Sequence, residues 1–269
     1  MHLAVNIEWL FTEQAQLPGR IEAAADAGVA SVEIWTWREK DLLALARAAQ
    51  ASGVTFASLC VEPEDGLLRR DAHAGYMRGL EESIHAAAQL GASQLIVLAG
   101  DLPGASEALG DPESERPWRD DPDGPWGALR EGLGAASAIA EREGAVLLLE
   151  PLNTKLDHPE HLLSSTALTL ALIEELDSPG LRLLLDLYHS SMMGEPPADE
   201  LLRGCEQALA HVHVADMPGR QEPGTGTIDW SRAVAALRAV GYDGAVGLEC
   251  QPSEATLGAL QRAREALAL

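Results

Sequence analysis

Eight short apolar segments alternate with longer helical patterns along the 269 residues of the chain, and this alternation restricts the fold more than any other feature. The apolar segments are 3–7, 30–36, 54–61, 93–100, 145–150, 181–186, 211–216 and 245–249. Most are near-continuous apolar runs, which are typical of parallel strands covered on both faces. The helical patterns lie at 20–27, 40–52, 74–90, 127–143, 161–176, 199–209, 230–240 and 254–267.

Eight strand-then-helix units predict an α/β protein that folds as a single (β/α)8 TIM barrel, with its site at the C-terminal ends of the strands. Single barrels of this kind have about 250 residues, so we expect one domain over 1–269. The rival architecture is a doubly wound open sheet. It lacks support because no strand–GxGxxG–helix unit is found, and Gly224-Thr225-Gly226 has no third glycine.

Charge and composition exclude several classes of function. The chain has 42 acidic and 19 basic residues, a net charge of −23, which is the opposite of what a nucleic-acid-binding protein needs. No run of 18 apolar residues is present, and the N-terminus reads as a first strand rather than a signal peptide. We expect a cytoplasmic protein that binds a small-molecule substrate but no nucleic acid or membrane. Assembly into a homo-oligomer stays open.

The three cysteines are too few and too scattered to form a disulfide framework or a zinc site. Cys60, Cys205 and Cys250 are isolated in sequence and form no CxxC motif. Neither a disulfide framework nor a cysteine-based zinc site is therefore expected.

Metal-capable side chains lie at the ends of four consecutive strands in the second half of the chain. Glu150, Asp186 and Glu249 each close an apolar run, and His213 lies within the seventh. One such residue could be a helix N-cap or a solvated turn residue. Four on neighbouring barrel strands can converge on one point. Three carboxylates and one imidazole predict one divalent metal ion, Mn²⁺, Mg²⁺ or Co²⁺, with Zn²⁺ as a further candidate.

Further polar residues accompany these four. His189, Arg220, Lys155 and Glu222 lie in the segments that follow the strands, and we regard them as candidate substrate contacts. We expect His211 to be structural and to point to the face of its strand opposite His213.

Three other acidic strand ends have alternative readings. Glu33 could line the barrel mouth or form a buried structural hydrogen bond. Glu62 and Asp101 are expected to act in a loop or cap. The segment 101–124, rich in Pro, Gly and acidic residues, is a long loop after the fourth strand and a candidate lid over the active site.

These site segments resemble the hydroxypyruvate isomerase family of the xylose-isomerase-like TIM barrels, which also include ketose 3-epimerases and endonuclease IV. The similarity is carried by E150-P-L-N-T-K, D186-L-Y-H, the stretch from His211 to Trp230, and G247-L-E249. It implies metal ligands at Glu150, Asp186, position 213 and Glu249, and substrate contacts from His189 and Arg220. The chain departs from the family at two positions, with His213 in place of the usual Gln and Thr227 in place of a Glu. Ketose 3-epimerases usually have His at this position.

The resemblance implies a metal-dependent isomerase of carbohydrate metabolism. We expect Glu150 and Glu249 to act as the acid–base pair of an aldose–ketose isomerisation that passes through a cis-enediolate. Arg220 offers a forked donor pair that would favour a hydroxypyruvate-type 2-oxo acid. The alternatives are a ketose 3-epimerase of the tagatose or psicose type and a non-catalytic barrel that binds a small molecule. An endonuclease is disfavoured by the charge and by the presence of only eight histidines.

Overall fold

A closed, all-parallel barrel of eight strands forms the centre of the molecule. The computed structural model describes residues 1–102, 117–196, 198, 205 and 207–269. The strands follow one another around the barrel in sequence order, and β1 closes it by pairing with β8. They are β1 (His2–Asn6), β2 (Ser31–Glu33), β3 (Thr55–Cys60), β4 (Gln94–Leu98), β5 (Val146–Glu150), β6 (Leu181–Asp186), β7 (Leu209–Val214) and β8 (Ala245–Leu248). The predicted TIM barrel is confirmed.

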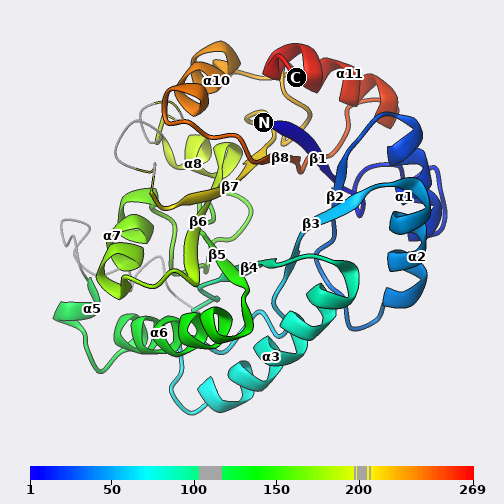
Figure 1. The fold of residues 1–269 in the computed structure, drawn as a ribbon. Coiled ribbons are helices and arrows are strands. Elements are labelled where there is room, and N and C mark those ends of the chain that lie inside the picture. The colour runs from blue at the N-terminus through cyan, green and yellow to red at the C-terminus, as the bar shows by residue number, and fades with distance from the viewer. Residues whose placement is uncertain (103–116, 197, 199–204, 206) are drawn as a thin grey trace.

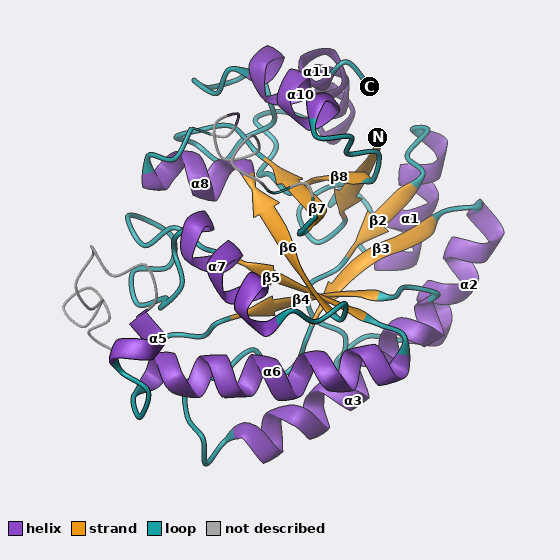
Figure 2. Ribbon diagram, turned by 60° about the vertical axis from the view of Figure 1, so that its left-hand side comes forward, coloured by secondary structure: helices purple, strands orange, loops and turns teal. Residues whose placement is uncertain are grey.

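Helices surround the strands (Figures 1 and 2). They are α1 (Leu17–Asp26), α2 (Leu42–Ser52), α3 (His73–Leu90), α5 (Pro117–Asp120), α6 (Pro125–Glu143), α7 (Thr166–Leu176), α8 (Leu187–Met193), α10 (Trp230–Ala239) and α11 (Thr256–Leu267). Local signals set their ends. Asp41 caps α2 by accepting a hydrogen bond from the amide of Ala44, and Gly53 ends that helix at φ +70°, where a side chain would be strained. No described helix is long and apolar enough to cross a membrane.

Two helical predictions differ from the structure. Helix α7 starts at Thr166 rather than at residue 161, because the Ser165 hydroxyl caps it by accepting from the amide of Leu168. Helix α8 follows β6 directly, where we expected none; its cap is Asp186, which accepts from the amides of Tyr188 and His189. A buried strand end that doubles as a helix cap leaves no loop signal in the sequence.

Two further predictions fall partly outside the described residues. The pattern at 199–209 ends in strand, since β7 begins at Leu209, and 199–204 and 206 lie outside the described residues. Within the predicted loop 101–124, Pro117–Asp120 forms the short helix α5, where no helix was expected. Residues 103–116 of this segment lie outside the described residues, so the lid stays a prediction.

The alternation of side chains along each strand places the site. Residues two apart on a strand face the same side, so Glu150 shares the inner face of β5 with Leu148. Leu148 belongs to a small apolar cluster with Cys60, Ile96 and Leu184 inside the barrel, whereas the larger core packs between strands and helices. Above this apolar floor, the barrel interior becomes polar toward the C-terminal ends of the strands.

Candidate metal centre

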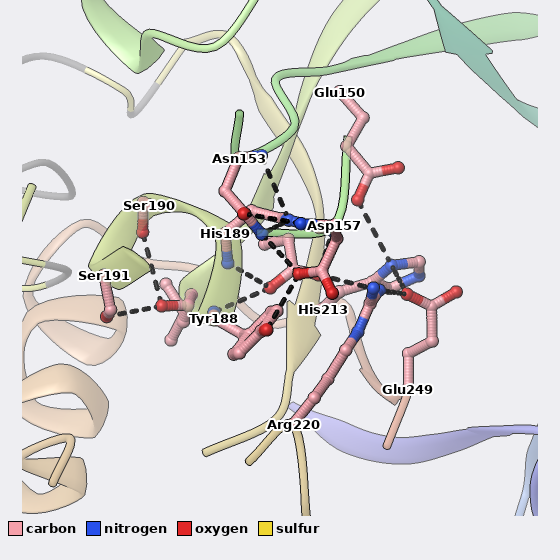
Figure 3. A network of polar contacts seen from close by, with 12 residues as sticks. Glu150, Asn153, Asp157, Tyr188, His189, Ser190, Ser191, His213, Arg220 and Glu249 are labelled. Atoms are coloured by element: carbon pink, nitrogen blue, oxygen red, sulfur yellow. Dashed lines mark hydrogen bonds and ion pairs between the residues drawn. The ribbon is translucent and has the colours of Figure 1, made fainter. Parts of the chain in front are cut away.

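The four predicted metal ligands converge at the C-terminal ends of β5 to β8. One ligand atom from each of Glu150, Asp186, His213 and Glu249 lies within 4.8 Å of all the others, and all four side chains are buried. Strand register explains the convergence. Asp186 on β6 pairs with His213 on β7, and His213 pairs with Gly247 on β8, two residues before Glu249. Figure 3 shows Glu150, His213 and Glu249 pointing toward one another from separate strands.

Several polar atoms of this cluster are buried without a hydrogen-bond partner, and a cation would interact favourably with them. Three buried atoms, Glu150 Oε1, Asp186 Oδ2 and His213 Nδ1, have no hydrogen-bond partner in the described part of the chain. An unsatisfied buried polar atom costs about 1–3 kcal/mol. His213 Nδ1 lies 3.7 Å from Glu150 Oε1 and 3.6 Å from Glu249 Oε2. Two ligand atoms that bind the same ion, each at about 2.0–2.6 Å from it, are separated from each other by a distance similar to these two. The residues therefore fit a divalent metal.

The electrostatics of the cluster agree with this fit. Burial, together with repulsion from Glu249 and Asp186, raises the pKa of Glu150 to about 7 even though His213 opposes the shift. Burial lowers the pKa of His213, but the charges of Glu249 and Glu33 outweigh it and raise that pKa well above its ordinary value. Three carboxylates held this close favour either protons or a metal ion.

His211 and Glu33 lie beside the cluster, and the expected orientation of His211 was wrong. Its ring is on the same inner face of β7 as His213, because residues two apart on a strand point the same way. His211 Nε2 lies 2.6 Å from Glu33 Oε1, and His213 Nε2 lies 3.3 Å from Glu33 Oε2. Burial raises the pKa of Glu33, but the two imidazoles outweigh it and hold that pKa below its ordinary value.

Arg220 reaches the cluster from the loop after β7. Its Nη2 lies 2.7 Å from Glu249 Oε2 and 3.9 Å from Asp186 Oδ2. The guanidinium carbon lies 5.0 Å from the ring centre of Trp9 and 5.1 Å from that of Tyr188. The Arg220 backbone is left-handed, with φ +51°, a conformation that costs a non-glycine residue about 1–3 kcal/mol and that clusters at functional sites. Its carbonyl accepts from the amide of Gln251, which fixes it to the loop after β8.

His189 is held as a neutral hydrogen-bond donor. Its Nδ1 accepts from the backbone amide of Asn153 at 3.2 Å and lies 2.7 Å from Asn153 Nδ2. The ring proton is therefore on Nε2, which lies 3.7 Å from Asp186 Oδ2. Burial, aided by the positive charge of Arg220, lowers the pKa of His189 well below its ordinary value. Figure 3 shows His189 between Asn153 and the candidate metal ligands.

The other two candidate substrate contacts have different neighbours. Lys155 is exposed, and its Nζ donates to the carbonyl of Met193 at 3.0 Å. Glu222 is fully buried, accepts from the amide and hydroxyl of Ser253, and forms an ion pair with Arg262. Glu222 thus joins the loop after β7 to the loop after β8. A substrate contact from Lys155 or Glu222 stays a prediction.

Two tryptophans at the site were not identified from the sequence. Trp35 Nε1 donates to Glu249 Oε1 at 2.6 Å, and the Trp9 and Trp35 rings meet edge to face at 4.9 Å. Both follow strand ends in a chain with only 4% aromatic residues. The position of a tryptophan shortly after a strand end, in a chain with few aromatic residues, could have indicated that Trp9 and Trp35 belong to the site. Asn153, which orients His189, carried no such signal.

Known proteins share this fold and sequence pattern. Residues 21–268 match the family described as xylose isomerase-like TIM barrel. A human protein named "Putative hydroxypyruvate isomerase" is 30% identical over 97% of this chain and 93% of its own length. The 2-oxo-tetronate isomerase of Cupriavidus necator is 26% identical over 96% and 95%. The crystal structure of an AP endonuclease, family 2, from Brucella melitensis shares the fold, with a TM-score of 0.81, 24% identity and 97% coverage of both chains. The chain belongs to the xylose isomerase-like TIM barrel family.

Proposed function

We propose that the chain is a divalent-metal-dependent isomerase that acts on a small 2-oxo acid of the hydroxypyruvate type. The observation that carries the proposal is the convergence of Glu150, Asp186, His213 and Glu249 on one point, with Arg220 beside it. The names of the two relatives, a hydroxypyruvate isomerase and a 2-oxo-tetronate isomerase, support an isomerase. We also propose that the chain is one domain and acts in the cytoplasm.

The metal would be held by these four side chains. Mn²⁺, Mg²⁺ or Co²⁺ suits the mostly oxygen donor set, with Zn²⁺ as a further candidate. When bound, it would supply Lewis-acid polarisation of the substrate carbonyl, which acidifies the neighbouring C–H bond.

Glu150 and Glu249 are the proposed acid–base pair. Glu150 is the last residue of β5 and Glu249 follows β8, so the two carboxylates would reach the substrate from different strands. One of the two, ionised, would remove a proton from the hydroxyl-bearing carbon to give a cis-enediolate, and the other, protonated, would deliver a proton to the adjacent carbon. The hydroxyl proton would pass from the first substrate oxygen to the second, which completes the exchange of carbonyl and hydroxyl groups. Trp35 and Arg220 hold the two oxygens of Glu249, which fixes its direction of approach.

Arg220 and His189 are the proposed substrate-binding residues. Arg220 Nε is buried and has no hydrogen-bond partner in the part of the chain that the structure describes, so it is available to a ligand oxygen. A planar guanidinium suits a carboxylate better than it suits single hydroxyl groups. His189, with its proton on Nε2, would donate to a substrate oxygen. These two donors favour an acidic substrate.

A ketose 3-epimerase of the tagatose or psicose type is the second candidate. His213 favours it, because the resembling hydroxypyruvate isomerases usually have Gln at that position. The same metal and glutamate pair would serve both reactions, so the substrate distinguishes them.

Turnover by metal-free and reloaded protein tests the proposal. The protein is stripped with a chelator, reloaded with Mn²⁺, Mg²⁺, Co²⁺ or Zn²⁺, and assayed with hydroxypyruvate, 2-oxo-tetronate, fructose and tagatose. We expect metal-dependent isomerisation of an acid. Faster turnover of fructose or tagatose would favour the epimerase, and absence of turnover of all four substrates would favour a binding protein.

A further inference from the structure

A buried carboxylate lies between two histidines inside the barrel, beside the proposed metal ligands. Glu33 on β2 and His211 and His213 on β7 are each exposed by 1% or less. Only His213 belongs to the ligand set, so the mechanism above gives Glu33 and His211 no role. We propose that Glu33 is a positioning residue of the metal centre, whose carboxylate holds the Nε2 side of His213 and thereby presents Nδ1 of that ring to the metal. This inference rests on the proposed metal centre.

The two nitrogens of His213 face different groups. Nδ1 faces the carboxylates of Glu150 and Glu249, at 3.7 and 3.6 Å. Nε2 forms an ion-pair contact with Glu33 Oε2 at 3.3 Å, and neither of these two atoms makes a hydrogen bond among the described residues. An ionised carboxylate can only accept, so this neighbour favours a proton on Nε2 and leaves the lone pair of Nδ1 for a metal. Ligand histidines are commonly oriented in this way by a carboxylate behind the ring.

His211 fixes the carboxylate of Glu33. His211 Nε2 lies 2.6 Å from Glu33 Oε1, the oxygen that His213 does not face. Each oxygen of Glu33 therefore has one imidazole beside it, and rotation of the carboxylate would break the contact with His211. The arrangement joins β2 to β7 across the inside of the barrel.

Gly247 provides the space for this arrangement. Gly247 lies on β8 in register with His213. A Cβ atom at this position would lie 2.6 Å from Glu33 Oε2 and 2.7 Å from His213 Cδ2, closer than such atoms can approach. Any side chain at 247 would displace the carboxylate or the ring, so substitution of Gly247 disturbs the contact without removing a charge.

A double-mutant cycle on metal affinity tests the role of Glu33. The dissociation constants of Mn²⁺ and Co²⁺ are measured by competition with a chromogenic chelator for wild type, Glu33→Gln, His213→Ala and the double variant. We expect Glu33→Gln to weaken binding about 10–100-fold, the usual effect of losing an outer-shell partner of a metal ligand. In the His213→Ala background it should change affinity by less than about twofold, because its effect passes through His213.

Two further variants keep the test decisive. Gly247→Ala should also weaken metal binding, although Glu33, His211 and His213 are all still present. It replaces Glu33→Gln as the test if that variant does not fold. Glu175→Gln on α7 is the control, since Glu175 is a largely buried carboxylate paired with Arg119 and Arg130 outside the barrel. It should bind metal as wild type does. Thermal unfolding of the metal-free proteins reports stability separately.

The outcomes separate this inference from the proposed function. Wild-type affinity in Glu33→Gln, or an equal loss with and without His213, overturns the positioning role and leaves the metal centre intact. Wild-type protein that binds neither Mn²⁺ nor Co²⁺ overturns both.

Discussion

Arg220 Nη2 lies 2.7 Å from Oε2 of Glu249, so the cation proposed to bind the substrate also contacts one of the two proposed acid–base residues. The contact links the loop after β7 to the end of β8. It gives Arg220 two separable effects, one on substrate affinity and one on the position of Glu249.

Removal of Arg220 should mainly weaken the binding of an acidic substrate. Arg220→Ala should raise KM for hydroxypyruvate about 10–150-fold, since a hydrogen bond to a charged group contributes about 1.5–3 kcal/mol. Arg220→Lys should restore only part of the lost substrate affinity, because an ammonium group cannot offer a carboxylate two parallel N–H donors as a guanidinium does. Steady-state kinetics check this. An unchanged KM for the acid in Arg220→Ala would show that the carboxylate binds elsewhere.

Neutralising either glutamate should reduce the chemical step. Glu150→Gln and Glu249→Gln should each lower kcat by at least about 10²-fold, the usual scale for a general acid or base. Metal content is measured alongside, because both residues are also proposed ligands. A variant with confirmed metal and a kcat within tenfold of wild type would exclude that residue as acid or base.

The indole of Trp35 should matter through Glu249. Trp35→Phe removes the 2.6 Å hydrogen bond to Glu249 Oε1, a bond to a charged acceptor, and should lower kcat about tenfold or more. Trp37→Phe is a matched control, because its indole donates to Ser83 instead. The control should keep activity within about twofold. Equal losses in the two variants would point to a general packing effect rather than to Glu249.

Asp216 should organise the loop that carries Arg220, and its effect on stability should depend on pH. It is buried and accepts from the amides of Gly224 and Ile228 and from the Trp230 indole. Burial raises the pKa of Asp216, but these hydrogen bonds outweigh it and hold that pKa below the ordinary value of 3.8. The stabilisation is therefore full above about pH 4–5 and is lost as the pH falls through the lowered pKa.

Asp216→Asn tests this. At pH 7 it should lower the free energy of unfolding by about 1–3 kcal/mol and raise KM for the acid substrate. Denaturant unfolding followed by tryptophan fluorescence at pH 7 and pH 3 measures the difference. A destabilisation of equal size at both pH values would contradict an ionised Asp216 as the acceptor.

The fold could be predicted from the sequence because strand and helix periods alternate eight times without interruption. The convergence of the four candidate ligands could be predicted because an ionisable residue at the end of an apolar strand is costly unless it has a partner. What could not be predicted depends on contacts distant in sequence. Trp35 and Glu249 are separated by 214 positions, and Glu33 and His211 by 178. The orientation of His211 could also have been predicted from the sequence, because residues two apart on a strand point to the same face. The expectation that His211 and His213 point to opposite faces was wrong.

The most direct test of the metal centre is anomalous diffraction from crystals of the protein loaded with Mn²⁺. We expect one peak per chain, within about 2.0–2.6 Å of an atom from each of Glu150, Asp186, His213 and Glu249. No peak at this position, or a peak more than about 3 Å from any two of the four side chains, would contradict the proposed centre.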